Sequence, residues 1–172
     1  MDGSQAVRLV LLHGEPAEMT ALQEVLESAP GFFELVDGGP PGPAEALSTY
    51  TVLPEGVTYE DKSVYGVYLG DLMVGCVDLI RGYPDAHSAM LGLFLIGEPW
   101  QGRGIGSAAY RETEGVVRGW ADAERVRIGV VRANVPAFGF WHAMGFTETG
   151  DVRPYESGPV TSEVVVMEKP LA

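Results

Sequence analysis

The stretch LFLIGEPWQGRGIGSAAY, residues 93–110, decides the fold. It begins with an apolar run, passes through glycines at every second position, Gly102, Gly104 and Gly106, and ends in residues that favour a helix. Glycine at this density costs backbone entropy on folding, so the backbone must turn tightly here or a ligand must approach it closely. A strand, a glycine loop and a helix N-terminus form a phosphate-binding layout, because the first N–H groups of a helix are unpaired and carry partial positive charge.

Two well-known phosphate-binding motifs fit this stretch poorly. A mononucleotide P-loop requires a lysine directly after its glycines, and no lysine follows Gly106. A dinucleotide fingerprint is matched by the spacing Gly104-x-Gly106-x-x-Ala109. That motif belongs after the first strand of a parallel unit, with a carboxylate ending the next strand. Here it follows antiparallel strands, and the next strand ends in Val131-Arg132.

The spacing Gln101-x-x-Gly104-x-Gly106 resembles the Q/R-x-x-G-x-G/A loop of the GNAT superfamily of N-acetyltransferases. In that family the loop amides bind the pyrophosphate of acetyl-CoA. Residues 93–110 resemble the family's apolar fourth strand, loop and helix start. The segment NVPAFGFWHAMGF, residues 134–146, resembles its second cofactor motif. The resemblance covers most of residues 60–150.

The resemblance implies a binding site for acetyl-CoA as acetyl donor. Backbone N–H groups near Phe94 to Ile96 would polarise the thioester carbonyl, on a strand that bulges and splays from its neighbour. Gly92 and Gly97 bracket that strand segment, which fits a distorted strand. Arg103 or Arg111 would meet the 3′-phosphate. The cofactor-binding residues implied in this way are Phe94, Leu95, Ile96, Gln101, Gly102, Arg103, Gly104, Ile105, Gly106, Ser107, Asn134 and Trp141.

The sequence departs from the family at the group that would protonate the leaving thiolate. Many members have a tyrosine just before the Gly-Phe of the second motif, and Trp141 stands in its place. An indole N–H is a far weaker acid than a phenol, although it can donate a hydrogen bond. Tyr155 is the catalytic residue we predict, with Tyr110 and His142 as alternatives, or CoA leaves as thiolate.

Asp78 interrupts the apolar run LMVGCVDLI. Alternation along a strand places it on the same face as Val74 and Cys76. A carboxylate there is costly unless it is paired or opens into a cleft, so Asp78 is predicted to face the acceptor amine as a catalytic group. The alternative is a structural aspartate bonded to Arg81 or to loop amides. His87, in the loop before the next strand, is a further predicted substrate-binding residue that could shuttle a proton.

Composition and charge limit the classes of partner that we expect. The chain has 172 residues and a formal net charge of −13 at pH 7. It shows no cluster of Lys and Arg, so neither nucleic acid nor an anionic membrane surface is an expected partner. The histidines and the single cysteine, Cys76, lack metal-ligand spacing. We expect a buried inert thiol and no metal. With no basic leader and no long apolar run, a cytoplasmic protein is expected.

The hydrophobic pattern predicts an α/β (α+β type) fold with a mixed, mostly antiparallel, twisted sheet of about six to seven strands and about four helices. Residues 1–172 are expected to form a single GNAT-like domain. The segment at 35–43 is predicted to be a loop, because glycine and proline are dense there. Strands are expected at 6–12, 63–69, 72–82, 89–97, 125–132, 146–156 and 160–170, and helices at 15–31, 44–50, 105–123 and 135–145.

These observations favour an acetyl-CoA-dependent N-acetyltransferase that acts on a primary amine of a small molecule or peptide. The alternative is a GNAT-like module that binds CoA without transferring an acetyl group, as a sensor or interaction protein; Trp141 keeps this alternative open. The residues do not name the acceptor, and the oligomeric state stays open, with a homodimer as one expectation.

Overall fold

A computed structural model describes residues 6–172. Its centre is a seven-stranded sheet in the order β1-β2-β3-β4-β5-β7-β6. Only β4 and β5 run parallel among the paired strands of the described chain; the other neighbours are antiparallel. The strands are β1 (Val7–Leu11), β2 (Lys62–Leu69), β3 (Leu72–Arg81), β4 (Ser88–Ile96), β5 (Arg125–Val131), β6 (Thr147–Ser157) and β7 (Val160–Pro170), and the helices are α1 (Pro16–Glu27), α2 (Pro30–Asp37), α3 (Glu45–Thr51), α4 (Ile105–Arg118) and α5 (Val135–Ala143), with short 3₁₀ turns η1 (Tyr59–Asp61) and η2 (Glu98–Trp100).

This arrangement confirms the predicted fold class. The antiparallel run β2-β3-β4 and the helical crossover α4, which joins the parallel strands β4 and β5, are both as expected. The single-domain prediction over residues 1–172 includes residues 1–5, which lie outside the described residues.

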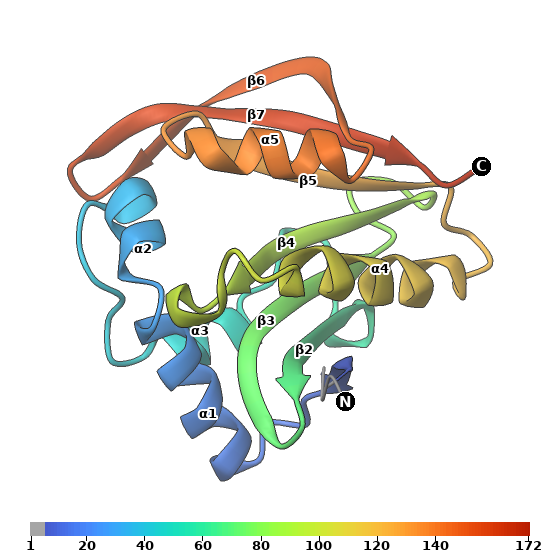
Figure 1. The fold of residues 1–172 in the computed structure, drawn as a ribbon. Coiled ribbons are helices and arrows are strands. Elements are labelled where there is room, and N and C mark those ends of the chain that lie inside the picture. The colour runs from blue at the N-terminus through green and yellow to red at the C-terminus, as the bar shows by residue number, and fades with distance from the viewer. Residues whose placement is uncertain (1–5) are drawn as a thin grey trace.

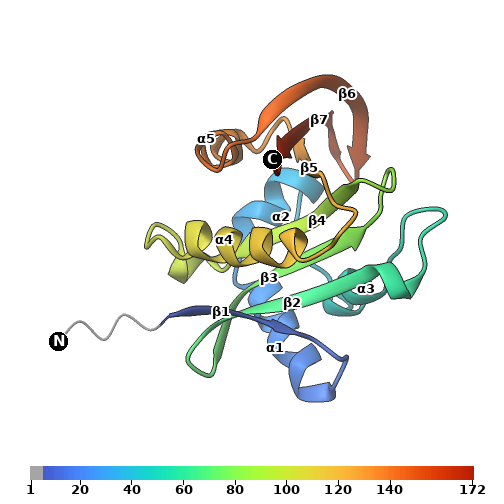
Figure 2. The same ribbon diagram turned by 90° about the vertical axis from the view of Figure 1, so that its right-hand side faces the viewer.

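Helices cover both faces of the sheet, with α4 and α5 on one face and α1, α2 and α3 on the other (Figures 1 and 2). Each face has its own core. The core under α4 and α5 includes Val77, Tyr110 and Phe146, and the core under α1 to α3 includes Leu22, Phe33 and Cys76. The sheet is therefore buried on both sides over much of its area. A ligand can reach its backbone where neighbouring strands separate.

The predicted burial of the Cys76 thiol is confirmed. Cys76 is fully buried in the core under α1 to α3, and this burial raises the pKa of its thiol to about 12. The thiolate, which is the nucleophilic form, is therefore scarce at neutral pH.

Two sequence predictions about α1 and α2 were wrong. Pro30-Gly31 was interpreted as the end of the first helix, but α1 ends at Glu27 and Pro30 is the first residue of α2. Proline is well tolerated in the first turn of a helix, because its missing N–H has no partner there in any case. Residues 35–37, predicted to be loop, are the last residues of α2, which ends at Gly38 with φ +76°.

A bulge in β3 changes which side chains share a face. Val67 pairs with Gly75 and Tyr68 with Met73, so Val74 is an extra residue in β3. Val74 consequently packs in the core under α4 and α5, whereas Cys76 packs in the core under α1 to α3. The prediction that Val74 shares a face with Cys76 and Asp78 was therefore wrong, since simple alternation holds only where the register is continuous.

Candidate active site

The site begins where the parallel pair β4 and β5 separates. Their pairing runs from Ser88 opposite Arg125 to Leu91 opposite Ile128 and ends there. Figure 1 shows the two strands meeting at one end and diverging toward the other. β4 is also distorted at this point: Asp78 pairs with Leu93 and Leu79 with Leu91, which leaves Gly92 as a bulge.

The divergence leaves backbone groups of β4 facing the gap. The Gly97 N–H donates to Val74 O at 2.8 Å. N–H groups alternate between the two sides of an antiparallel strand. The N–H groups of Ile96 and Phe94 therefore point away from β3, toward the space between β4 and β5. This is the distorted, splayed strand that the resemblance implied.

The glycine loop leads into the N-terminus of α4. Gly102 and Gly104 have φ of +74° and +78°, and Gly104 is the N-cap of α4. A Cβ at either position would meet no atom of the described chain within 4 Å, so the space in front of both is open. Glycine is favoured here because side chains rarely adopt this left-handed conformation. The loop and the first turn of α4 thus form an open cradle that an anion can enter.

Neighbouring side chains hold this loop in shape. The Gln101 Nε2 donates to Ile96 O at 2.8 Å, which ties the loop to the end of β4. The guanidinium of Arg103 lies 5.2 Å from the centre of the Trp100 ring. Gly106 has a different role: a Cβ there would lie 3.3 Å from the Phe140 ring, so this glycine allows α4 to pack closely on α5.

A continuous cleft of about 890 Å³ joins these parts. It runs from the glycine loop, between the ends of β4 and β5, to α2 and β6. Two of the predicted cofactor-binding residues do not line it: Arg103 is stacked on Trp100, and Ile105 is buried in the core. The predicted cofactor-binding residues that the structure brings together along the cleft are Phe94, Leu95, Ile96, Gln101, Gly102, Gly104, Gly106, Ser107, Asn134 and Trp141.

Trp141 belongs to an aromatic cluster at the middle of the cleft. It is 7% exposed, and its ring centre lies 5.3 Å from that of Phe94 and 4.8 Å from that of Phe140. Tyr110 and Phe146 contact it from the core side, at 5.8 and 5.1 Å. Edge-to-face packing of this kind holds an indole rigidly. Trp141 therefore forms a wall of the cleft.

Of the three groups predicted as possible acids, Tyr155 alone lines the cleft. Its hydroxyl donates to Val36 O at 2.8 Å, and burial, followed by the nearby charge of Asp37, raises the pKa of the phenol. The Tyr110 hydroxyl points instead to Glu114, at 3.2 Å. His142 is exposed on α5 and pairs with a carboxylate of β6 at 2.8 Å.

Asp78 lies beside the cleft without lining it. Lys62 Nζ donates to Asp78 Oδ1 at 2.9 Å, and the two side chains are 3% and 14% exposed. A Cβ on Gly92 would lie 2.8 Å from Asp78 Oδ2, so the carboxylate sits directly under the bulge. Burial raises the pKa of Asp78, and Lys62 opposes that shift.

The structure does not bring His87 to the cleft. His87 precedes the first residue of β4, whereas the cleft lies along the last residues of that strand. Its Nδ1 lies 3.2 Å from Asp122 O, and its side chain is exposed. Leu91, the first residue of β4 that lines the cleft, stands four residues after His87, or roughly 13 Å along the strand.

The sequence analysis missed α2, which forms the far wall of the cleft through Phe32, Leu35 and Val36. The signal was present, because the apolar run GFFELV stands between a proline and a glycine, the usual start and end of a helix. Figure 1 shows α2 at the end where β4 and β5 diverge.

Contacts from both ends of the cleft hold α2 in place. At its start, Glu98 Oε1 accepts the Gly31 N–H at 2.7 Å. At its end, Ser157 Oγ donates to Asp37 Oδ1 at 2.6 Å, two residues beyond Tyr155 on β6. The glycine loop and β6 are thus both connected to the same short helix.

Two further observations concern metals and membranes. Within residues 6–172, no group of three or more His, Cys, Asp or Glu side chains is arranged to hold a metal ion. No helix in the same residues combines the length and the apolar character needed to cross a membrane.

The splayed parallel pair, the open helix N-terminus and the crossover helix together form one cleft that an anionic ligand can enter. Residues 23–146 match the model of the acetyltransferase (GNAT) family, which is more than half of the chain. The chain therefore belongs to the GNAT acetyltransferase family. No curated protein matches it.

Solved structures agree with this family over nearly the whole chain. An acetyltransferase from Thermus thermophilus is 28% identical with a TM-score of 0.73, covering 98% of this chain and 99% of that one. The spermidine N-acetyltransferase from Vibrio cholerae in complex with CoA and spermine is 17% identical, with a TM-score of 0.75 over 97% and 96%. The ribosomal-protein-S18-alanine N-acetyltransferase from Escherichia coli is 14% identical, with a TM-score of 0.69 over 96% and 94%.

Proposed function

We propose that this protein is an N-acetyltransferase that moves an acetyl group from acetyl-CoA to a primary amine by direct attack. The observation that carries the proposal is the continuity of the cleft. It connects an open helix N-terminus, suited to a pyrophosphate, with outward-facing amides of β4 and with an acceptor wall built by α2 and Tyr155. The names of two fold neighbours, which denote transfer to a nitrogen, support an amine as acceptor.

The residues of the cleft fit acetyl-CoA at its donor end. The N–H groups at the start of α4, behind Gly102 and Gly104, suit a pyrophosphate, since the space in front of both glycines is open. When bound, acetyl-CoA supplies a thioester carbonyl as the source of the acetyl group. The outward-facing N–H groups of Phe94 and Ile96 would donate hydrogen bonds to the oxygen of that carbonyl and stabilise negative charge there.

Tyr155 is the side chain we assign to the leaving group. Its pKa is raised by burial, so the phenol keeps its proton through neutral and mildly alkaline pH. The hydroxyl hydrogen, which is donated to Val36 O in this structure, would have to turn from that carbonyl to the departing thiolate and be transferred to it. Trp141 lacks that acidity and shapes the middle of the cleft instead.

The test is acetyl transfer measured by detection of released thiol, with a panel of amines. We expect Tyr155→Phe to lower kcat at least about 10-fold with unchanged affinity for acetyl-CoA, because a general acid contributes more than this in most enzymes. Tyr59→Phe is the matched control. The Tyr59 hydroxyl also donates to a backbone carbonyl, Thr51 O at 3.0 Å, but Tyr59 lies outside the cleft.

Three outcomes separate the alternatives. A drop with Tyr155→Phe and none with Tyr59→Phe supports the assignment of Tyr155. Equal activity of both variants removes Tyr155 from the chemistry. If the folded protein binds CoA in calorimetry yet releases no thiol with any amine, the protein is a CoA-binding module and the transferase proposal is wrong.

A further inference from the structure

The half of the cleft that faces α2 is lined mainly by apolar side chains. Phe32, Leu35 and Val36 come from α2, Leu93 from β4 and Val164 from β7. Leu35 is 39% exposed, so a bound ligand can contact its side chain. A ligand with an apolar body is favoured here, because its binding removes apolar area of both the ligand and the cleft from water.

The buried charges nearest to this half are paired. Asp78, under the bulge at Gly92, accepts a hydrogen bond from Lys62 at 2.9 Å. Both side chains are largely buried, so water has little access to either charge and cannot readily take the place of its partner. The pair is neutral as a unit and offers little net charge to a cationic ligand.

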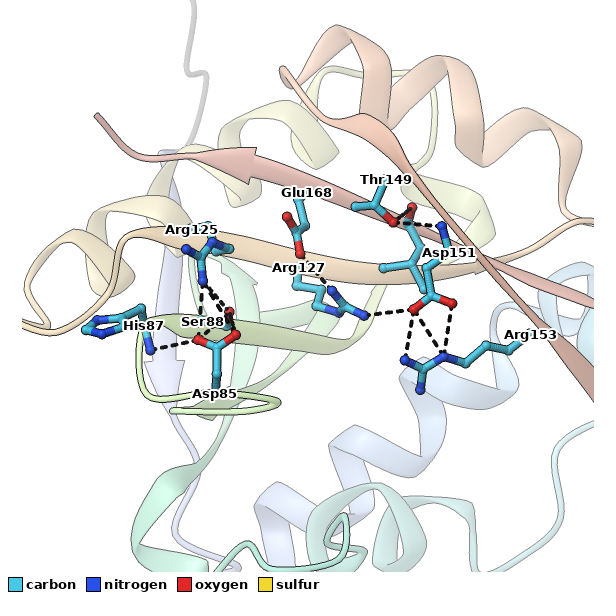
Figure 3. A network of polar contacts seen from close by, with 10 residues as sticks. Asp85, His87, Ser88, Arg125, Arg127, Thr149, Asp151, Arg153 and Glu168 are labelled. Atoms are coloured by element: carbon cyan, nitrogen blue, oxygen red, sulfur yellow. Dashed lines mark hydrogen bonds and ion pairs between the residues drawn. The ribbon is translucent and has the colours of Figure 1, made fainter.

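A second group of charges, on β5, β6 and β7, is also balanced (Figure 3). Arg127 contacts Glu168 at 2.7 Å and Asp151 at 3.2 Å, and Arg153 contacts Asp151 at 2.8 Å. Two guanidinium groups thus face two carboxylates. Gly129 and Tyr155 line the cleft. Arg127 and Arg153 each stand two residues earlier on the same strand, and residues two apart on a strand share a face. This group of charges therefore lies next to the cleft.

The carboxylates at the two ends of α2 have internal donors as well. Glu98 accepts the Gly31 N–H at 2.7 Å, and Asp37 accepts the Ser157 hydroxyl at 2.6 Å. These neutral donors leave both carboxylates charged, but Asp37 does not line the cleft, and Glu98 is the one charged residue among the described residues that do. This half differs from the site that a polyamine would require, in which unpaired carboxylates meet each ammonium group.

We infer that the acceptor is a monoamine whose amino group is attached to an uncharged apolar body, aromatic or aliphatic, and not a polyamine or an acidic amino acid. This inference rests on the proposed function, since it names the substrate class of the same site. Each methylene that becomes buried against α2 should raise kcat/KM by up to about fourfold.

Hexylamine and 1,6-diaminohexane form the sharpest test, because they have the same length and differ by one distal amino group. We expect kcat/KM for hexylamine to be at least about 10-fold higher than for the diamine. We also expect it to rise steadily from ethylamine through butylamine to hexylamine. Equal or better use of the diamine, or a flat series, would overturn the inference.

A substitution on α2 tests whether this helix sets the preference for hexylamine over the diamine. Leu35→Asp adds a carboxylate at the exposed edge of the acceptor half and should shift the ratio of hexylamine to diamine toward the diamine by at least about 10-fold. Leu47→Asp is the matched control, since Leu47 is 58% exposed on α3 and lies outside the cleft. An unchanged ratio in folded Leu35→Asp would contradict the assignment of α2 as the acceptor wall.

A binding measurement separates this inference from the proposed function. Calorimetry of the two amines with the CoA-saturated protein reports the class of ligand without turnover. Tighter binding of hexylamine with no acetyl transfer would overturn the transferase proposal and leave the ligand class standing. Tighter binding of the diamine would overturn the ligand class whatever the activity.

Discussion

The two ends of the cleft are built in different ways. The donor end comes from one continuous stretch, from Phe94 at the end of β4 to Ser107 in the first turn of α4. The acceptor end comes from α2, β4, β6 and β7, and the bond from Tyr155 to Val36 O joins residues 119 positions apart. A local structure is specified by local sequence, whereas the acceptor end depends on how distant elements pack.

The largest effect we expect comes from the buried pair beside the acceptor end. Asp78→Asn should lower the free energy of unfolding by about 3 kcal/mol, because it leaves the buried ammonium of Lys62 without its partner. Lys62→Met combined with Asp78→Asn should recover most of this loss, since no charge then remains buried. Denaturation in urea at neutral pH measures both variants.

Activity distinguishes the structural role of Asp78 from a catalytic one. If the double variant is stable but its kcat falls by more than about 10-fold, Asp78 acts on the amine as the sequence predicted. If the kcat of the double variant stays near that of the parent protein, the carboxylate serves only to support the bulge at Gly92.

The same pair gives a pH dependence with a defined sign. Burial raises the pKa of Asp78 in the folded protein above its usual value of 3.8. The folded state therefore holds this proton where the unfolded state has lost it, and the stability from this group falls as pH rises from about 3.8 through the folded pKa. The double variant should lack this fall in an unfolding series across acid pH; an unchanged profile would contradict the shift.

The next largest effect is expected from a substitution in the glycine loop at the donor end. Gly104→Val places a side chain in the open space before α4, in a backbone conformation of φ +78°. We expect affinity for CoA to fall at least about 10-fold, which is about 1.4 kcal/mol. Gly56→Val is the matched control, because Gly56 has φ of +82°, equally open surroundings and no place in the cleft.

The comparison of the two glycine variants isolates the ligand contact from backbone strain. Both variants should lose similar stability, but only Gly104→Val should lose CoA affinity in calorimetry. Similar affinity for CoA in the two folded variants would show that the loop does not hold the pyrophosphate.

The backbone layout of the donor end, a strand followed by a glycine loop and a helix start, could be predicted because its signals are local. Left-handed glycines at 102 and 104, and the strand–loop–helix order around them, can be inferred from neighbouring residues alone. The order of the strands and the parallel crossover also followed from connection lengths, since short loops favour antiparallel neighbours and a helix is needed to connect parallel ones.

The acceptor end was harder to predict for physical reasons. The extra residue Val74 reverses the alternation along β3, and periodicity does not reveal a bulge. His87 was placed near the acceptor because it is close to β4 in sequence, but it precedes the wrong end of that strand. Asp78 was predicted to face the acceptor amine, with bonding to Arg81 or loop amides as the alternative; its partner is Lys62 on the neighbouring strand, 16 residues away.

Trp141 lies between the two ends, and its replacement should have the smallest effect on the rate. The indole packs against Phe94, Tyr110, Phe140 and Phe146, so Trp141→Phe should cost about 1–2 kcal/mol of stability through lost packing. We expect kcat to change by less than about threefold, because Tyr155 is the group assigned to the leaving thiolate.

Trp120→Phe serves as the comparison for this substitution. Trp120 packs against the same core near the end of α4, with the Arg81 guanidinium 5.7 Å from its ring centre, and lies outside the cleft. Thermal unfolding and kcat are measured for both variants at a temperature where each is folded. A loss of an order of magnitude in kcat for Trp141→Phe alone, with unchanged affinity for acetyl-CoA, would assign the thiolate to the indole N–H. The two ends of the cleft would then meet at Trp141, and Tyr155 would act only in holding α2.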